Sequence, residues 1–320
     1  RAIEAAAAAF PAWRATPATE KGRLIRRLGD LMVRDQERLA AIMTAEQGKP
    51  LAESRGEIAY AASFLEFAAG EAQRVYGQTV PASARDKRIL VLKQPIGVAA
   101  AITPWNFPSA MITRKLGPAL AAGCTMVIKP AEQTPLSAFA IGELAVEAGL
   151  PAGAVNIITG DAPTIGREIF RHDAVKKVSF TGSTEVGKIL MEQAASRVVK
   201  VSLELGGHAP FIVFDDADVD RAVAGLMANK FRNAGQTCIC ANRILVHDKV
   251  HDQFIKSLRD KVAALKVGSG TGEGVHIGPL IDDHAIAKVE AHVADARAQG
   301  GTIPVGGSRT IQTAGTDTAL

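Results

Sequence analysis

The strongest constraint on the fold is an alternation between short apolar runs and longer amphipathic segments, which begins near Ile96. The predicted strands span residues 98–103, 125–129, 155–158, 175–180 and 199–204. Helix-type spacing of apolar residues separates them, over 109–121, 136–148, 164–170 and 184–194. Buried strands that alternate with helices are typical of α/β proteins. The pattern therefore predicts a doubly wound parallel sheet.

Seven residues that stand out in the sequence fall just after these predicted strands. They are Trp105, Asn106, Lys129, Glu132, Gly160, Gly182 and Ser183. Ligands of an open parallel sheet bind beyond the carboxyl ends of its strands. The chain has no Gly-x-Gly-x-x-Gly run, so the usual dinucleotide fingerprint does not identify the ligand. Ser183 begins a predicted helix, where free N–H groups can face a phosphate. A simple helix cap explains Ser183 about as well.

Two of the three cysteines, Cys238 and Cys240, lie among small and polar residues in the stretch 231–243. A thiol in such surroundings can stay accessible and reactive. Cys124 follows a glycine at the start of a strand, and we predict that it is buried packing. Glu204 ends a predicted strand before two glycines. We interpret Glu204 as the base that thiol chemistry needs.

Four motifs in this order resemble the aldehyde dehydrogenase family: Pro-Trp-Asn-Phe-Pro at 104–108, Phe-Thr-Gly-Ser-Thr at 180–184, Glu-Leu-Gly-Gly at 204–207 and Gly-Gln-Thr-Cys at 235–238. The residues after Trp105 and the Cys-Ile-Cys pair look most like its succinate-semialdehyde dehydrogenase branch. The resemblance implies oxidation of an aldehyde to an acid through a thiohemiacetal and a thioester on Cys238. It implies that Asn106 steadies the oxyanion and that Glu204 activates the hydrolytic water.

The resemblance also implies a nicotinamide cofactor. The residues expected at its site are Thr103, Pro104, Trp105, Lys129, Glu132, Gly160, Gly182, Ser183 and Leu205. A carboxylate at Glu132 would repel a 2′-phosphate, which favours NAD, with NADP as the alternative. Otherwise Glu132 would be a solvent-facing capping residue.

An acidic aldehyde needs a cationic pocket, and in this branch Arg114 and Arg232 look like the clamp for its carboxylate. Either arginine alone is more simply read as half of a surface ion pair. Glutarate semialdehyde stays open, because one methylene is worth only about 1–3 kcal/mol of discrimination. Cys240 is either a small buried filler or a redox partner that forms a reversible disulfide with Cys238.

The expected domains are a cofactor-binding domain over 1–76 and 96–206, a hairpin over 77–95 and the start of a second α/β catalytic domain over 207–320. Residues 1–47 are helical in pattern, including 23–45, and a further helix runs from about Leu51 to Arg74. The hairpin resembles an oligomerisation arm, which implies a homodimer or homotetramer. Residues 306–320 show no period. Members of the family extend further at both ends, so we expect a fragment of a longer enzyme.

Composition excludes several other classes. The net charge of +4 is spread along the chain, which disfavours nucleic-acid binding. The apolar run 96–102 is shorter than the about 20 residues that cross a bilayer. Three cysteines form no disulfide framework, so a cytoplasmic location is the default. No metal site is expected. Two alternatives are a non-catalytic nucleotide-binding protein and a thiol redox protein, the latter disfavoured because no thioredoxin-like context surrounds Cys-Ile-Cys.

Overall fold

The computed structural model describes residues 1–310, which divide into two compact units. The first unit comprises Arg1–Glu46 and Ser54–Leu205, and the second comprises Gln47–Glu53 and the chain from Gly206 onward. Segment Gln47–Glu53, part of the predicted cofactor-binding domain, groups instead with the second unit. Its backbone is anchored there, since the Leu51 N–H donates to the Gly270 carbonyl at 2.9 Å.

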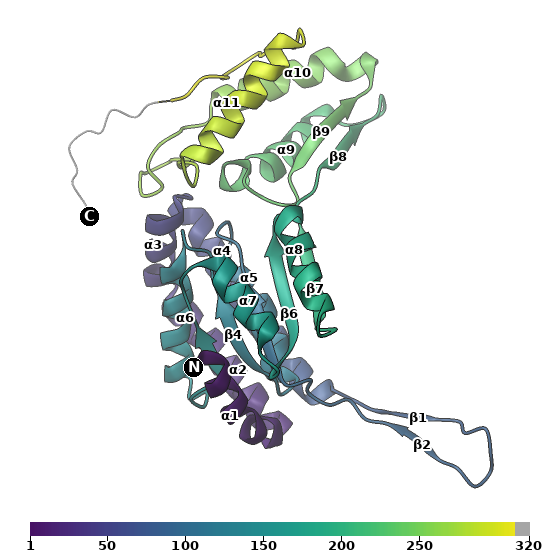
Figure 1. Cartoon of the computed structure of the whole chain (residues 1–320). Coiled ribbons are helices and arrows are strands. Elements are labelled where there is room, and N and C mark those ends of the chain that lie inside the picture. The colour runs from purple at the N-terminus through teal and green to yellow at the C-terminus, as the bar shows by residue number, and fades with distance from the viewer. Residues whose placement is uncertain (311–320) are drawn as a thin grey trace. The chain divides into compact units, whose positions relative to one another are not determined.

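A five-stranded sheet in the order β5-β4-β3-β6-β7 forms the centre of the first unit (Figure 1). Its strands are β3 (Val98–Ile102), β4 (Thr125–Lys129), β5 (Val155–Ile157), β6 (Val175–Gly182) and β7 (Lys200–Leu205). Every neighbouring pair is parallel. The chain runs outward from β3 to β5 and returns to β6 beside β3, so the winding reverses between β3 and β6. The predicted doubly wound parallel sheet is confirmed.

Four helices connect these strands close to the predicted positions. They are α5 (Ala110–Ala121), α6 (Pro135–Glu147), α7 (Ala162–Arg171) and α8 (Thr184–Ala195). Alternate residues of β3 and β6, such as Val98 and Val178, pack against Phe170 of α7 and Leu190 of α8 in one buried cluster. These side chains are buried because a parallel sheet is covered by its own crossover helices.

The amino-terminal residues form α1 (Ala2–Ala15), α2 (Ala18–Arg34), α3 (Gln36–Gln47), α4 (Leu51–Glu71) and the 3-10 turn η1 (Ala72–Arg74). The helical pattern over 23–45 continues through two helices, because the chain turns at Asp35. The Asp35 carboxylate accepts hydrogen bonds from Arg34 at 2.6 Å and Arg38 at 3.1 Å. Apolar periodicity cannot reveal this break, because the apolar residues on both sides of it keep helical spacing.

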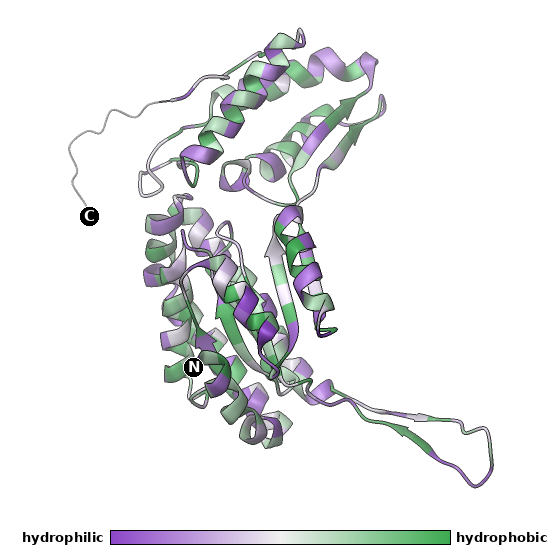
Figure 2. Ribbon diagram, viewed as in Figure 1, coloured by the Kyte–Doolittle hydropathy of each residue, from purple (hydrophilic) through white to green (hydrophobic). Residues whose placement is uncertain are grey.

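A hairpin of β1 (Gln78–Val80) and β2 (Ile89–Val91) projects from the body of the first unit (Figure 1). The strands are antiparallel, with Thr79 opposite Leu90. Every residue of both strands is exposed, although β2 is apolar (Figure 2).

The second unit contains β8 (Ala209–Val213) paired in parallel with β9 (Ala241–Val246). Its helices are α9 (Val219–Lys230), the 3-10 turn η2 (Arg232–Gly235), α10 (Asp248–Ala263) and α11 (Asp283–Ala298). Val213, Val223 and Phe254 form its core. Helix α11 was not predicted, although Ile286, Val289 and Val293 recur at helical spacing. None of its residues is buried.

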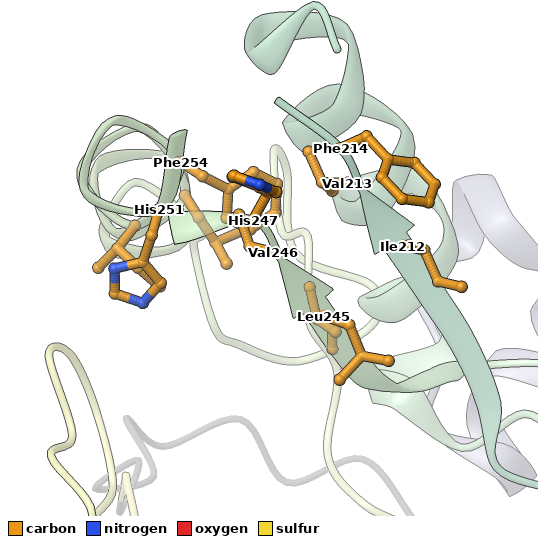
Figure 3. Close-up of a pocket in the computed structure, with 11 residues that line it drawn as sticks. Ile212, Val213, Phe214, Leu245, Val246, His247, His251 and Phe254 are labelled. Atoms are coloured by element: carbon orange, nitrogen blue, oxygen red, sulfur yellow. The ribbon is translucent and has the colours of Figure 1, made fainter. Parts of the chain in front are cut away.

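An apolar groove lies between the strands and α10, lined by residues such as Phe214, Leu245 and Phe254, with His247 and His251 beside them (Figure 3). It contains none of the predicted site residues. Residues 306–310 are irregular, and the rest of the predicted tail lies outside the described residues. Within residues 1–310, no helix is long and apolar enough to cross a bilayer.

Candidate active site

The carboxyl edge of the five-stranded sheet gathers most of the predicted cofactor residues. Residues 103–106 follow β3, Lys129 ends β4, and Gly182 ends β6. Leu205, the last residue of β7, is in register with Gly182. The strands β3 and β6 flank the reversal of winding, which is where a doubly wound sheet has its ligand crevice.

Thr103 has an unsatisfied hydroxyl at this edge. Its N–H donates to the Lys129 carbonyl at 3.1 Å. Its Oγ1 is buried and has no hydrogen-bond partner within residues 1–310. Pro104, Trp105 and Asn106 follow it as half-buried residues. A buried hydroxyl without a partner is costly, so a bound ligand that hydrogen-bonds to Thr103 would remove that cost.

Lys129 and Glu132 form an ion pair beyond β4. The Lys129 side chain is 5% exposed, whereas that of Glu132 is 54% exposed. Glu132 does not cap α6. The N–H groups of Leu136 and Ser137 in the first turn of that helix donate instead to the Glu46 carboxylate, at 2.8 and 2.9 Å. The capping interpretation of Glu132 is therefore wrong, and the arrangement leaves its carboxylate facing solvent beside a buried ammonium group.

Local backbone geometry and packing explain why glycine stands at two positions of the sheet edge. Gly160 has φ +138°, a conformation that side chains rarely adopt. A Cβ on Gly182 would lie 2.4 Å from the Phe180 ring. Ser183 is the cap of α8, since its Oγ accepts the Val186 N–H at 3.2 Å. Its hydroxyl proton can still be donated to a ligand.

Glu204 lies on β7 opposite Thr181 of β6 and is exposed. The structure adds a residue that the sequence interpretation missed, Lys115 of α5. Its Nζ donates to Thr181 Oγ1 at 2.7 Å and to Ser179 Oγ at 3.2 Å. Burial lowers the pKa of Lys115 to about 8, and attraction to Glu204 opposes that change. The only signal in the sequence was a lysine among the apolar residues of a predicted helix.

Cys238 follows a loop with unusual backbone geometry in the second unit. Asn233, Ala234 and Gly235 all have left-handed φ, of 51°, 54° and 76°. The loop is held at Asn233, whose N–H donates to Glu53 at 2.8 Å and whose Oδ1 accepts from Gln47 at 2.9 Å. These two contacts explain why Gln47–Glu53 groups with this unit. Sequence reasoning missed this anchor.

The three cysteines differ in accessibility. Cys238 is exposed, whereas Cys124 and Cys240 are buried. Cys240 Sγ lies 3.3 Å from the Gly235 carbonyl oxygen and accepts a hydrogen bond from Thr237 Oγ1 at 2.8 Å. Cys240 is thus packed against this loop, as the filler interpretation expects, and its role as redox partner of Cys238 stays a prediction.

The two predicted clamp residues lie in different units. Arg114 is on α5 in the first unit, half-buried. Arg232 begins η2 in the second unit and is exposed. Of the three predicted catalytic residues, Asn106 and Glu204 lie in the first unit and Cys238 in the second.

The family model described as "Aldehyde dehydrogenase family" matches residues 1–318. The chain belongs to the aldehyde dehydrogenase family. It is 60% identical over 306 residues to Escherichia coli (strain K12) succinate-semialdehyde dehydrogenase [NADP(+)] GabD, covering 96% of this chain and 64% of that protein. It is also 60% identical over 307 residues to a Pseudomonas putida glutarate-semialdehyde dehydrogenase, with the same coverage.

Solved structures of other aldehyde dehydrogenases share this fold. The crystal structure of succinate-semialdehyde dehydrogenase from Burkholderia pseudomallei matches with a TM-score of 0.96 at 56% identity, over 97% of this chain and 64% of that one. The chain therefore spans about 64% of the length of each of these three proteins.

Proposed function

We propose that this aldehyde dehydrogenase oxidises succinate semialdehyde to succinate. The observation that carries the proposal is an exposed Cys238 on an anchored loop in a chain 60% identical to a succinate-semialdehyde dehydrogenase. Glutarate semialdehyde is the second candidate, because a glutarate-semialdehyde dehydrogenase is equally similar.

The proposed chemistry assigns each step to a side chain. The Cys238 thiolate forms a C–S bond to the aldehyde carbon, because the thiolate is the nucleophilic form. Asn106 and the Cys238 N–H donate hydrogen bonds to the resulting oxyanion, and losing one such donor typically costs about 10²–10³ in rate. When bound at the sheet edge, NAD would supply the hydride acceptor, and loss of hydride from this carbon would leave a thioester on Cys238. Glu204 takes a proton from the water that breaks the C–S bond and releases the acid.

We propose NAD as the preferred cofactor, with NADP possible. The residues at the sheet edge fit a dinucleotide, since Thr103 offers an unpartnered buried hydroxyl and Lys129 a buried ammonium group. We propose that Lys129 and Glu132 bind the adenine ribose, and that Ser183 and the first turn of α8 bind the pyrophosphate. The solvent-facing Glu132 carboxylate would repel the 2′-phosphate of NADP. A similar Escherichia coli enzyme has NADP in its name, so this preference needs a direct test.

We propose that Arg114 and Arg232 bind the carboxylate of the substrate. Arginine forms paired hydrogen bonds with carboxylates, which also orients the aldehyde end. We further propose that the protein assembles into a homodimer or homotetramer through its hairpin.

The test measures reduction of NAD or NADP by absorbance. The substrates compared are succinate semialdehyde, glutarate semialdehyde and the uncharged aldehyde butyraldehyde. We expect NAD reduction with the acidic aldehydes, none in Cys238→Ala, and a shift toward NADP in Glu132→Ser, which removes the repelling charge. The acidic aldehyde that gives the faster cofactor reduction is the substrate. A wild-type preference for NADP would refute the cofactor proposal. No reduction with any of these aldehydes would refute the activity.

A further inference from the structure

Arg114 is held by two aromatic residues of α4. Tyr60 and Phe64 are four residues apart, which places them on the same face of the helix, and their ring centroids are 4.6 Å apart. The guanidinium carbon of Arg114 lies 4.7 Å from the Phe64 centroid and 5.8 Å from that of Tyr60. Arg114 Nη2 also donates to the Tyr60 hydroxyl at 2.5 Å. The guanidinium group is thus fixed by one hydrogen bond and by ring contact.

Among residues 1–310, Arg114 has no acidic partner, unlike many of the other arginines there. Arg34, Arg55 and Arg171, for example, each pair with a glutamate. No aspartate or glutamate within residues 1–310 forms an ion pair with Arg114, and its Nε is buried without a hydrogen-bond partner. A guanidinium group carries five N–H donors and no acceptor. Because Nε is buried, the Nη donors that Tyr60 leaves unused are the ones that an anion would meet.

The surroundings of Arg114 also favour an anion. Lys115 is the next residue, and the repulsion between the two cations contributes to the lowered pKa of Lys115. Glu204 attracts Lys115. Tyr60 is 45% exposed, so its side chain is accessible from solvent. A hydroxyl that accepts from Arg114 keeps its own proton to donate.

We propose that Tyr60 is a positioning and specificity residue, which fixes the Arg114 guanidinium group and donates its own hydroxyl proton to the carboxylate of an anionic aldehyde. Phe64 supports the guanidinium group from the side. The proposal rests on the proposed oxidation of an acidic aldehyde. It adds the neutral Tyr60 hydroxyl to the arginines that bind the substrate carboxylate. Preorganised donors bind an anion more tightly than a freely rotating arginine, because less conformational freedom is lost on binding.

Tyr60→Phe tests this directly, because it removes one oxygen and keeps the ring against Arg114. We expect the KM for succinate semialdehyde to rise about tenfold, as for a lost hydrogen bond to a charged group, with kcat nearly unchanged. The KM for butyraldehyde, which has no carboxylate, should not change. Tyr76→Phe is the matched control, since Tyr76 is the only other tyrosine of the chain, and it should leave both values unchanged.

Direct binding separates this inference from the proposed function. Succinate, the dianionic product, is titrated by calorimetry into the wild type, Tyr60→Phe and Arg114→Gln, with thermal unfolding as a check of folding. We expect weaker binding in both variants. If no aldehyde is oxidised, the proposed function fails, and this titration still tests the inference. Equal changes in KM for both aldehydes, or unchanged succinate affinity in Tyr60→Phe, would overturn the role of Tyr60.

Discussion

Lys115 is a lysine buried on α5, and burial lowers its pKa from 10.5 to about 8. Compared with the unfolded chain, the folded state therefore shifts the equilibrium toward the neutral amine. Between about pH 8 and the ordinary pKa of 10.5, the unfolded chain binds more protons at this residue than the folded chain does. The contribution of Lys115 to the free energy of unfolding consequently rises with pH across this window. Below it, the charged form is buried and destabilises the fold.

Replacing Lys115 by methionine should remove this dependence. We expect Lys115→Met to be more stable than the wild type at about pH 7, with the difference shrinking toward about pH 10. Urea unfolding over this range measures it. Lys176→Met changes an exposed lysine and should show no such trend. A stability difference for Lys115→Met that does not change with pH would show that the ammonium group is not destabilised by burial.

For single residues, the sequence predicted exposure correctly where the residues adjacent in sequence indicate it. Cys238 lies in a polar stretch and is exposed, and Cys124 follows a glycine and is buried. Lys115 and Tyr60 could not be predicted in the same way. The hydrogen-bond partners of Lys115 lie on strand β6, and the hydrogen-bond partner of Tyr60 lies on α5. Neither contact is visible in the local sequence.

The loop before Cys238 is an element whose geometry depends on distant residues. Left-handed backbone costs a non-glycine residue roughly 1–2 kcal/mol, and both Asn233 and Ala234 adopt it. The contact from Asn233 to Glu53 joins residues 180 positions apart. Such strain persists only where surrounding contacts hold it, and it is concentrated at functional sites.

Removing the Glu53 side chain should loosen this loop. We expect Glu53→Ala to lower the free energy of unfolding by about 1–3 kcal/mol, because the Asn233 N–H loses its acceptor. Hydrogen–deuterium exchange over residues 233–238 should become faster. Glu37→Ala is the control, since it removes another glutamate whose ion pair with Arg55 is largely exposed. Unchanged exchange in Glu53→Ala would mean that the loop keeps its shape without this contact.

The elements of the sheet could be predicted because each is specified by its own periodicity. Strand β4 has the predicted bounds, and α8 differs from its prediction by one residue. The break between α2 and α3 could not be predicted, since helical spacing continues across it. Helix α11 was missed although Ile286, Val289 and Val293 have helical spacing, and none of its residues is buried. The grouping of Gln47–Glu53 with the second unit arises from contacts distant in sequence, which periodicity does not report.

For the molecule as a whole, the hairpin is the feature that points beyond a single chain. Its exposed apolar residues are Val80, Ile89, Leu90, Val91 and Leu92. An isolated two-stranded hairpin is at best marginally stable in water, and its outer edges carry unpaired backbone groups that can pair with another chain. Leu90 and Leu92 are 68% and 73% exposed. Association with a second copy would bury these side chains.

We expect Leu90→Lys to weaken the association of subunits, because a charge would replace an apolar contact at the proposed interface. Ser83→Lys adds the same charge in the exposed turn between the strands and removes no apolar side chain, so it should preserve assembly. Molar mass by light scattering after size exclusion distinguishes the two. A wild-type protein with the mass of one chain would refute the proposed oligomer. An oligomer whose mass is unaffected by Leu90→Lys would place the interface elsewhere, because a buried lysine without a partner charge would not be tolerated.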